Sequence, residues 1–180
     1  MLRTILIFGT IAGLIVGTPM VAMMLLWHRP DPVGGSLFFG YAGMVIALSA
    51  VFVGVKSYRD KVRGGIIKFL PALGVGLGIS LVAGVFYVLA WELSLAVTHV
   101  DHISGYANAE IANAKASGAS QAEIDKIAAS MAEMKAMYAN PVTRMGLTLT
   151  EILPVGVLVS LVTAALLRNS RFMPARPAAA

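Results

Sequence analysis

Four long runs without charged side chains restrict what this chain can fold into. Three of the runs cover residues 4–27, 37–55 and 69–91, and a fourth at 145–167 contains Glu151 as its single charged residue. Each run has about 20 residues, the length with which a helix crosses a hydrocarbon core of roughly 30 Å. Hydrophobic residues make up 58% of the 180 positions, against roughly 45 to 50% in soluble domains. The pattern predicts an all-α, polytopic membrane protein with four transmembrane helices.

The first run differs from a cleaved export signal in its length. Arg3 precedes it as a basic n-region would, but the apolar region of a signal peptide spans only about 7 to 15 residues. No A-x-A cleavage site follows the run, so we expect it to remain as a membrane anchor. The chain has no cysteine, which excludes disulfides, a thiol nucleophile and thiolate metal ligands.

Lysine and arginine are divided unequally between the two sides of these spans. One side carries nine cations and a single acid, Asp60; the cations are Arg3, Lys56, Arg59, Lys61, Arg63, Lys68, Arg168, Arg171 and Arg176. The other side carries five cations and six acids, namely Arg29, Lys115, Lys126, Lys135 and Arg144 against Asp31, Asp101, Glu110, Glu123, Asp125 and Glu133. The positive-inside rule places the nine-cation side in the cytoplasm. We expect both termini there, and no nucleic-acid partner, because topology accounts for the positive charge.

The chain is expected to form a single membrane domain over residues 1–180. Its parts are transmembrane segments at 4–27, 37–55, 69–95 and 145–167, a cytoplasmic loop at 56–68, an extracytoplasmic helical hairpin at 98–140 and a cytoplasmic tail at 168–180. Gly9, Gly13 and Gly17 recur every four residues in the first span, and Gly74 and Gly78 do so in the third. Small residues at this spacing let helix backbones approach closely. We therefore predict that the first and third spans form the tightest pair.

The connection between the third and fourth spans has the pattern of two helices. Its apolar positions follow three-four spacing, at Ile103, Tyr106, Ala107, Ile111 and Ala114 and then at Ile124, Ile127, Met131, Met134 and Tyr138. Gly118 separates the two stretches, Ser120 and Glu123 form a capping box, and Asn140-Pro141 closes the second helix. A hairpin of this size is too small to bury a core alone. We expect it to dock on the outer ends of the spans or on a partner.

Glu151 is the main candidate for a functional side chain inside the membrane, where an ionisable group is costly and often has a role. Because the third and fourth spans run in opposite directions, Glu92 lies in the same half of the bilayer. An outward-facing polar site is predicted from Glu151, Glu92, Tyr41, Tyr87, Trp91, Thr148 and Thr150. Such a site could bind a proton or a cationic substrate.

Structural interpretations of the same carboxylates remain open. Glu151 could pair with Arg144 two turns earlier, or it could bind a backbone carbonyl freed by Pro154 or Pro19. Glu92 could be a boundary residue whose side chain reaches the interface.

Two further groups of residues are weaker candidates for binding. The predicted cytoplasmic loop could bind anionic lipid headgroups through Lys56, Arg59, Lys61 and Arg63. His99 and His102 have the i, i+3 spacing of metal ligands, with Asp101 between them and with Met131, Met134 and Met137 as thioether donors elsewhere. Two or three ligands are too few to predict a metal, and we expect no cofactor.

Several motifs together resemble a bacterial family of four-span inner-membrane proteins known only as a domain of unknown function. The motifs are Gly40-Tyr41-x-x-Met44, Gly54-Val55-Lys56-x-Tyr58-Arg59-Asp60-Lys61 with Gly64-Gly65, Ala116-Ser117-Gly118-Ala119-Ser120, Asn140-Pro141 and Glu151-Ile152-x-Pro154-Val155-Gly156. The resemblance covers nearly the whole chain. It implies the same architecture and a bacterial inner membrane, and it implies no activity, cofactor or catalytic residue.

The sequence contains no glycine-rich phosphate loop, no Ser-His-Asp order and no H-E-x-x-H motif. We therefore expect a non-enzymatic structural or interaction protein that docks through the outer hairpin onto a membrane-protein partner or a second copy. The alternative is a small proton-coupled transporter that uses Glu151 and that would need a dimer to enclose enough volume.

Overall fold

The structure is a computed structural model that describes residues 1–26, 33–99 and 101–175. In chain order its helices are α1 (Leu2–Leu26), α2 (Val33–Val62), α3 (Phe69–Thr98), α4 (His102–Ala116), α5 (Gln121–Ala139) and α6 (Pro141–Leu167). These ranges contain no strand, which confirms the all-α prediction. Arg29, Asp31 and Arg176, which entered the charge comparison, lie outside the described residues.

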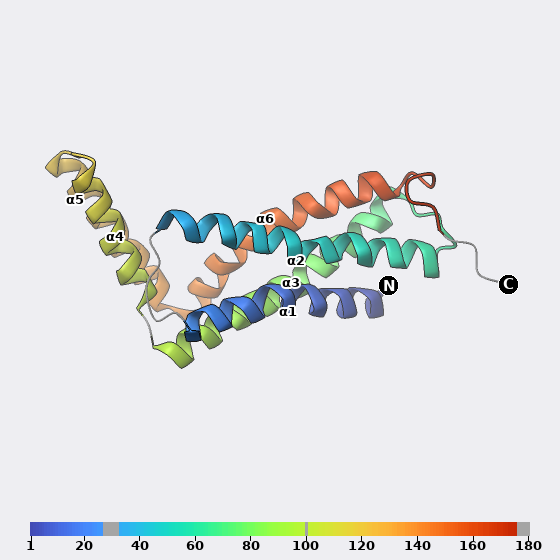
Figure 1. Ribbon diagram of the computed structural model, residues 1–180, viewed down its shortest axis with the longest axis horizontal. Helices are drawn as coiled ribbons and strands as arrows, with labels where there is room; N and C mark the ends of the chain where they lie inside the picture. Colours follow the sequence, from blue (N-terminus) through green and yellow to red (C-terminus); the bar gives the residue numbers. More distant parts are fainter. Residues whose placement is uncertain (27–32, 100, 176–180) are drawn as a thin grey trace.

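Four of the helices, α1, α2, α3 and α6, are long and apolar enough to cross a membrane. They run side by side as an elongated bundle (Figure 1). The first residues of α1 and the last residues of α6 lie at one end of the bundle, here called the termini end. The α4–α5 hairpin leaves the bundle at the opposite end, here called the hairpin end. The four candidate spans predicted from the uncharged runs are therefore all present as helices.

The helices continue beyond the uncharged runs. α2 extends through Lys56 and Arg59 to Val62, into the segment predicted as a loop. It stops before Gly64 and Gly65, whose φ angles of 65° and 90° are unfavourable for residues with a side chain. The charged residues that follow the apolar run therefore belong to the helix. Lysine, arginine and aspartate do not interrupt the backbone hydrogen bonding, which continues until the glycines.

α1 packs along α3 through its glycine face. A Cβ atom added to Gly9 would lie 2.5 Å from Cβ of Val82, and one added to Gly17 would lie 2.9 Å from Cβ of Ala90. Both distances are too short for real side chains, so any larger residue would push the helices apart. The predicted close pairing of the first and third spans is confirmed.

The opposite side of α3 packs against α6 through small polar residues. The hydroxyl oxygens of Ser80 and Ser160 lie 3.2 Å apart, and Ser160 Oγ donates to the Gly156 carbonyl at 2.7 Å. A Cβ atom at Gly156 would meet Cβ of Ser80 at 2.8 Å. Helix association in lipid uses this combination of small residues and hydrogen bonds. α3 is thus the central helix, with α1 on one side and α6 on the other.

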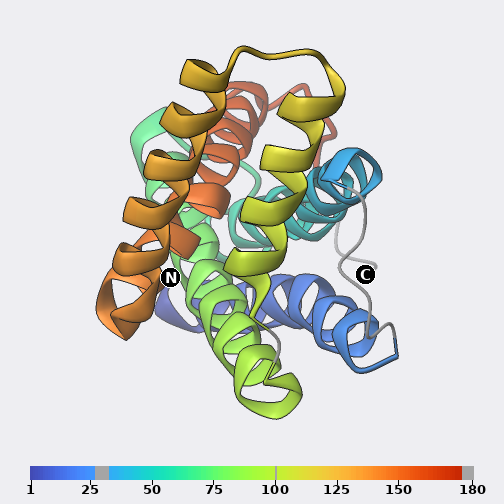
Figure 2. The same cartoon turned by 90° about the vertical axis from the view of Figure 1, so that its left-hand side faces the viewer.

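The end of α4 and both ends of α5 lie where the sequence predicts, while α4 begins at His102, because α3 extends through Thr98. The Asp101 side chain accepts from the Ser104 amide at the start of α4, and Ser120 and Glu123 form the predicted capping box at the start of α5. Between them Gly118 has a φ of 77°. Figure 2 views the molecule from the hairpin end and shows α4 and α5 side by side. None of their described side chains is fully buried.

Candidate functional site

Glu151 accepts a hydrogen bond from a buried tyrosine of the neighbouring helix. The Tyr87 hydroxyl on α3 donates to Glu151 Oε2 at 3.0 Å, and the tyrosine side chain is 8% exposed. Glu151 itself lies on the exposed surface of α6. The carboxylate therefore has one face bound to α3 and one face open to the surroundings of the bundle.

Glu92 of α3 pairs with Arg144 of the neighbouring helix α6. Arg144 Nε donates to Glu92 Oε1 at 2.7 Å, and Arg144 Nη2 contacts Glu92 Oε2. The two side chains are 19% and 18% exposed. The pairing of Glu151 with Arg144 is therefore wrong, while the interpretation of Glu92 as a boundary residue stays a prediction. The fork of the guanidinium matches the carboxylate of α3 across the helix interface, whereas Glu151 points to Tyr87.

Tyr138, near the end of α5, completes a cluster that joins the hairpin to the bundle. Trp91 Nε1 donates to the Tyr138 hydroxyl at 2.5 Å, and Arg144 Nη1 donates to the Tyr138 carbonyl at 3.3 Å. The Arg144 guanidinium also lies 5.7 Å from the centre of the Tyr138 ring, within cation–π range. Burial raises the pKa of the Tyr138 phenol, which keeps the hydroxyl protonated. We call Trp91, Glu92, Tyr138 and Arg144 the hairpin junction.

Thr148 and Thr150 of the predicted polar site donate hydrogen bonds to their own helix and not to Glu151. Thr148 Oγ1 donates to the Arg144 carbonyl at 3.0 Å and Thr150 Oγ1 donates to the Leu147 carbonyl at 2.6 Å. Both therefore bind their own helix. Tyr41 is 50% exposed and lies close enough to Tyr87 for an electrostatic interaction. The predicted site thus contains a Tyr87–Glu151 pair with Tyr41 nearby. The hairpin junction lies close to this pair, because Tyr138 interacts electrostatically with both Tyr87 and Glu151.

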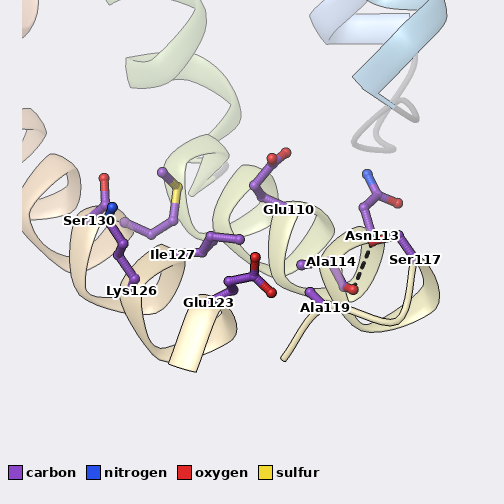
Figure 3. Close-up of a pocket in the computed structure, with 10 residues that line it drawn as sticks. Glu110, Asn113, Ala114, Ser117, Ala119, Glu123, Lys126, Ile127 and Ser130 are labelled. Carbon is purple, nitrogen blue, oxygen red and sulfur yellow. Dashed lines mark hydrogen bonds between the residues drawn. The ribbon is translucent and has the colours of Figure 1, made fainter. Parts of the chain in front are cut away.

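A surface groove of about 730 Å³ lies between α4 and α5. Its apolar residues are Ala114, Ala119, Ile127 and Met131, and its polar residues are Glu110, Asn113, Ser117, Glu123, Lys126 and Ser130. Figure 3 shows Ile127 pointing from α5 toward α4, with Glu110 on α4. Ile127 and Met131, two of the apolar positions predicted on the second hairpin helix, therefore line a groove between the hairpin helices.

The candidate headgroup-binding residues at the termini end fall into two pairs. Lys56 and Arg59 both contact Asp60, the latter at 2.7 Å. Arg59 is also fully buried, at 0% exposure. Lys61 and Arg63 are exposed. The first pair is thus engaged within the protein, while the second remains open to a ligand.

Arg59 binds the segment that follows α6. Its Nη1 donates to the Phe172 carbonyl at 2.9 Å and its Nη2 donates to the Met173 carbonyl at 2.5 Å. The Phe172 ring packs edge-on against Phe52 of α2, with 6.3 Å between the ring centres. A buried guanidinium with five donors can saturate main-chain carbonyls in this way. The C-terminal segment at 168–175 is therefore held against α2.

The weak metal candidates are not assembled into a site in the described part of the chain. There, no three side chains of histidine, aspartate, glutamate or cysteine come together. His99 ends α3 in the left-handed conformation, with a φ of 51° and its amide bonded to the Leu95 carbonyl. The side chain of His102 lies outside the described residues.

Two features were beyond what the sequence pattern predicted. Tyr138 was assigned to the apolar stripe of the hairpin, yet it binds the hairpin junction, and the C-terminal segment was assigned only to a tail. A tyrosine two residues before the Asn140-Pro141 break and three aromatic or apolar residues at 172–174 are the only local signals. The partners of both lie far away in sequence.

Comparisons with known proteins identify a family and no activity. Neither the curated proteins nor the solved structures include a significant match to this chain. A family profile matches residues 7–169, which span all four bundle helices and the hairpin. By that match, the chain belongs to the family described as "Protein of unknown function (DUF4199)".

Proposed function

We propose that this is a non-enzymatic integral protein of a bacterial inner membrane, with both termini in the cytoplasm and the hairpin outside. The four long apolar helices support insertion, and the excess of cations at the termini end supports the orientation. In this arrangement the α4–α5 hairpin is a docking arm for another protein.

The observation that carries the docking role is the groove between α4 and α5. Its apolar residues, among them Ile127 and Met131, are only partly covered by the hairpin itself. The hairpin junction ties the base of the arm to α3 and α6 through two hydrogen bonds to Tyr138, one from Trp91 to its hydroxyl and one from Arg144 to its carbonyl. An arm fixed at its base and open along its length presents the groove in a defined direction.

The occupant that fits the groove is an amphipathic helix of a different protein, with a cationic side chain facing Glu110. An apolar floor with a polar rim is the surface into which such a helix packs. Glu110 lines the groove and takes part in none of the ion pairs of the described residues, all of which involve other acids. A lysine or arginine of the partner would supply its counter-charge.

Site-specific photocrosslinking tests this proposal in native membranes. A crosslinking amino acid is placed at Met131 in the groove or, as the matched control, at Ala132, which is exposed on the same helix but does not line the groove. The expected result is one partner protein crosslinked from Met131 and not from Ala132, with the crosslink in an amphipathic helix.

A charge exchange then tests the orientation of that helix. Glu110→Lys should weaken capture, and replacing the facing cation of the partner by glutamate should restore it, because the pair is reversed and not removed. Equal capture from both positions overturns the groove as the docking surface. Crosslinking between copies of this chain overturns the choice of occupant, and no product in native membranes overturns docking.

Proton-coupled transport is a second candidate, supported by the Tyr87–Glu151 pair. An ionisable side chain on the surface of a span is costly in lipid, and here a buried hydroxyl holds it at 3.0 Å. The transport role requires a second copy to enclose a path. In proteoliposomes Glu151→Gln should abolish a pH-dependent substrate flux while the variant stays folded; an unchanged flux removes Glu151 from the mechanism.

A further inference from the structure

We infer that the termini end carries a composite site for the phosphate of anionic lipid headgroups. The site combines the connection between α2 and α3 with the C-terminal segment. Its ligands are Lys61, Arg63, Lys68, Arg168 and Arg171. The inference rests on the proposed membrane insertion and is independent of the docking role of the hairpin.

The first argument is the charge that remains after internal pairing. Asp60 is the only acid on this side of the chain, and it is bound by Lys56 and Arg59. The five site residues are all exposed, and none takes part in an ion pair of the described residues. The protein therefore leaves a cluster of five cations without an internal counter-charge, and an anionic ligand fits it.

The second argument is that the fold brings the two cationic segments together. Arg59, just before Lys61, donates to the carbonyls of Phe172 and Met173, just after Arg171. At the turn between α2 and α3, a Cβ atom on Gly65 would lie 3.2 Å from Cβ of Ala175. More than a hundred residues separate these segments in the chain, so their joint surface is a product of tertiary structure.

The third argument is the position of this surface along the bundle. Lys61 and Arg63 lie at the end of α2, Lys68 directly precedes α3, and Arg168 directly follows α6. These are the ends of three candidate spans, the level at which headgroup phosphates lie and at which basic residues contact them. The lipid is a better fit than a soluble anion because these cations stand at the ends of helices that would reach the membrane surface.

Arg59 acts as a positioning residue and not as a phosphate ligand. It is fully buried, and each of its three nitrogens donates within the protein, Nε to Asp60 and the other two to the carbonyls. Holding the C-terminal segment against α2 keeps Arg171 beside the α2–α3 connection. Phe172, whose ring meets Phe52, contributes to the same placement without carrying charge.

The test uses the full-length protein purified in an uncharged detergent and titrated with phosphatidylglycerol or phosphatidylcholine. Native mass spectrometry counts bound lipids, and thermal unfolding reports the linked stabilisation. Arg168→Gln with Arg171→Gln should weaken phosphatidylglycerol binding by about tenfold or more, since each cation near the surface contributes to anionic-lipid binding. The matched control is Lys115→Gln with Lys126→Gln on the hairpin, which should leave lipid binding unchanged.

Two further measurements test the lipid assignment and the positioning role. Inorganic phosphate at the same concentration should not replace the lipid; equal stabilisation by phosphate would show a soluble-anion site and overturn the lipid assignment. Phe172→Ala should lower phosphatidylglycerol affinity while leaving the number of charges intact, which tests the positioning role with a variant expected to fold.

Loss of lipid binding in the hairpin control, or no preference for phosphatidylglycerol over phosphatidylcholine, overturns the site. Absence of the protein from the membrane fraction of cells would instead overturn insertion, and with it the proposed function.

Discussion

An arginine side chain joins separate segments at each end of the bundle, but the two arginines have different partners. At the hairpin end Arg144 pairs with the carboxylate of Glu92, and both side chains keep some exposure. At the termini end Arg59 is fully buried and donates to two main-chain carbonyls as well as to Asp60. An ion pair at a partly exposed site is screened and adaptable, whereas a buried guanidinium requires every donor to be satisfied. The side-chain contacts at the hairpin end can therefore rearrange, whereas those at the termini end cannot.

The largest loss of folding stability is expected from Arg59→Ala. The change leaves the Phe172 and Met173 carbonyls without their donor and removes a buried partner of Asp60. Loss of one partner of a buried charged network costs about 3 to 5 kcal/mol. Thermal unfolding in detergent should show a large drop in midpoint, while Arg63→Ala, at an exposed position, should change it little. Similar midpoints for the two variants would show that the buried arginine contributes no more to stability than an exposed one.

A smaller loss of folding stability is expected from Arg144→Ala at the hairpin junction. The Arg144–Glu92 pair is partly exposed, so its loss should cost about 1 to 3 kcal/mol. The cost should fall in high salt, unlike that of Arg59→Ala, because exposed pairs are screened. A double-mutant cycle with Glu92→Gln measures the coupling. A salt-independent cost as large as that of Arg59→Ala would make the two ends equivalent.

Glu151→Gln should have a still smaller effect on stability. The amide oxygen of glutamine can accept the Tyr87 hydrogen bond in place of the carboxylate, so we expect a change of about 1 kcal/mol or less. Thermal unfolding of wild type and variant across pH provides the measurement. A clearly less stable variant at neutral pH would make Glu151 a structural partner and would weaken the transport candidate.

The smallest effect on stability is expected at the tip of the hairpin. There the Glu123 carboxylate accepts hydrogen bonds from the Ser120 hydroxyl and amide. These hydrogen bonds lower the pKa of Glu123 below its ordinary value of 4.5. The contribution to folding is therefore complete above that value and is lost as pH falls through the lower folded pKa. An NMR titration of the Ser120 amide should have a midpoint below 4.5. In a Ser120→Ala variant the midpoint should move up toward the ordinary value.

Local features of the chain could be predicted because their causes are local. The capping box of Ser120 and Glu123, the turn at Gly118 and the Asn140-Pro141 break each depend on residues a few positions apart. The four candidate spans follow from hydropathy over about 20 residues. The glycines at four-residue spacing in α1 even predicted its neighbour, since only a helix with matching small or adaptable residues can approach so closely.

The candidate sites could not be predicted to the same degree. Glu92 and Glu151 were expected to share one polar site, but each found a separate partner, Arg144 and Tyr87. Which carboxylate meets which donor depends on the rotation of α3 and α6 about their own axes. A rotation by one residue, about 100° on a helix, would turn either carboxylate away from its partner, and hydropathy does not set this rotation.

The sequence by itself determined the helices, the breaks at Gly118 and Asn140-Pro141 and the side of the bundle that carries most cations, because these follow from short-range hydrogen bonding and from the amount of charge in each segment. Only the tertiary structure decided which cations remain exposed and available to bind a ligand. It buried Arg59 against the C-terminal segment, placed Arg144 against Glu92, and left Lys61 and Arg63 exposed beside Arg168 and Arg171. The physical reason is that a charged side chain acquires its role from the groups that desolvate and neutralise it, and those groups come from distant parts of the chain.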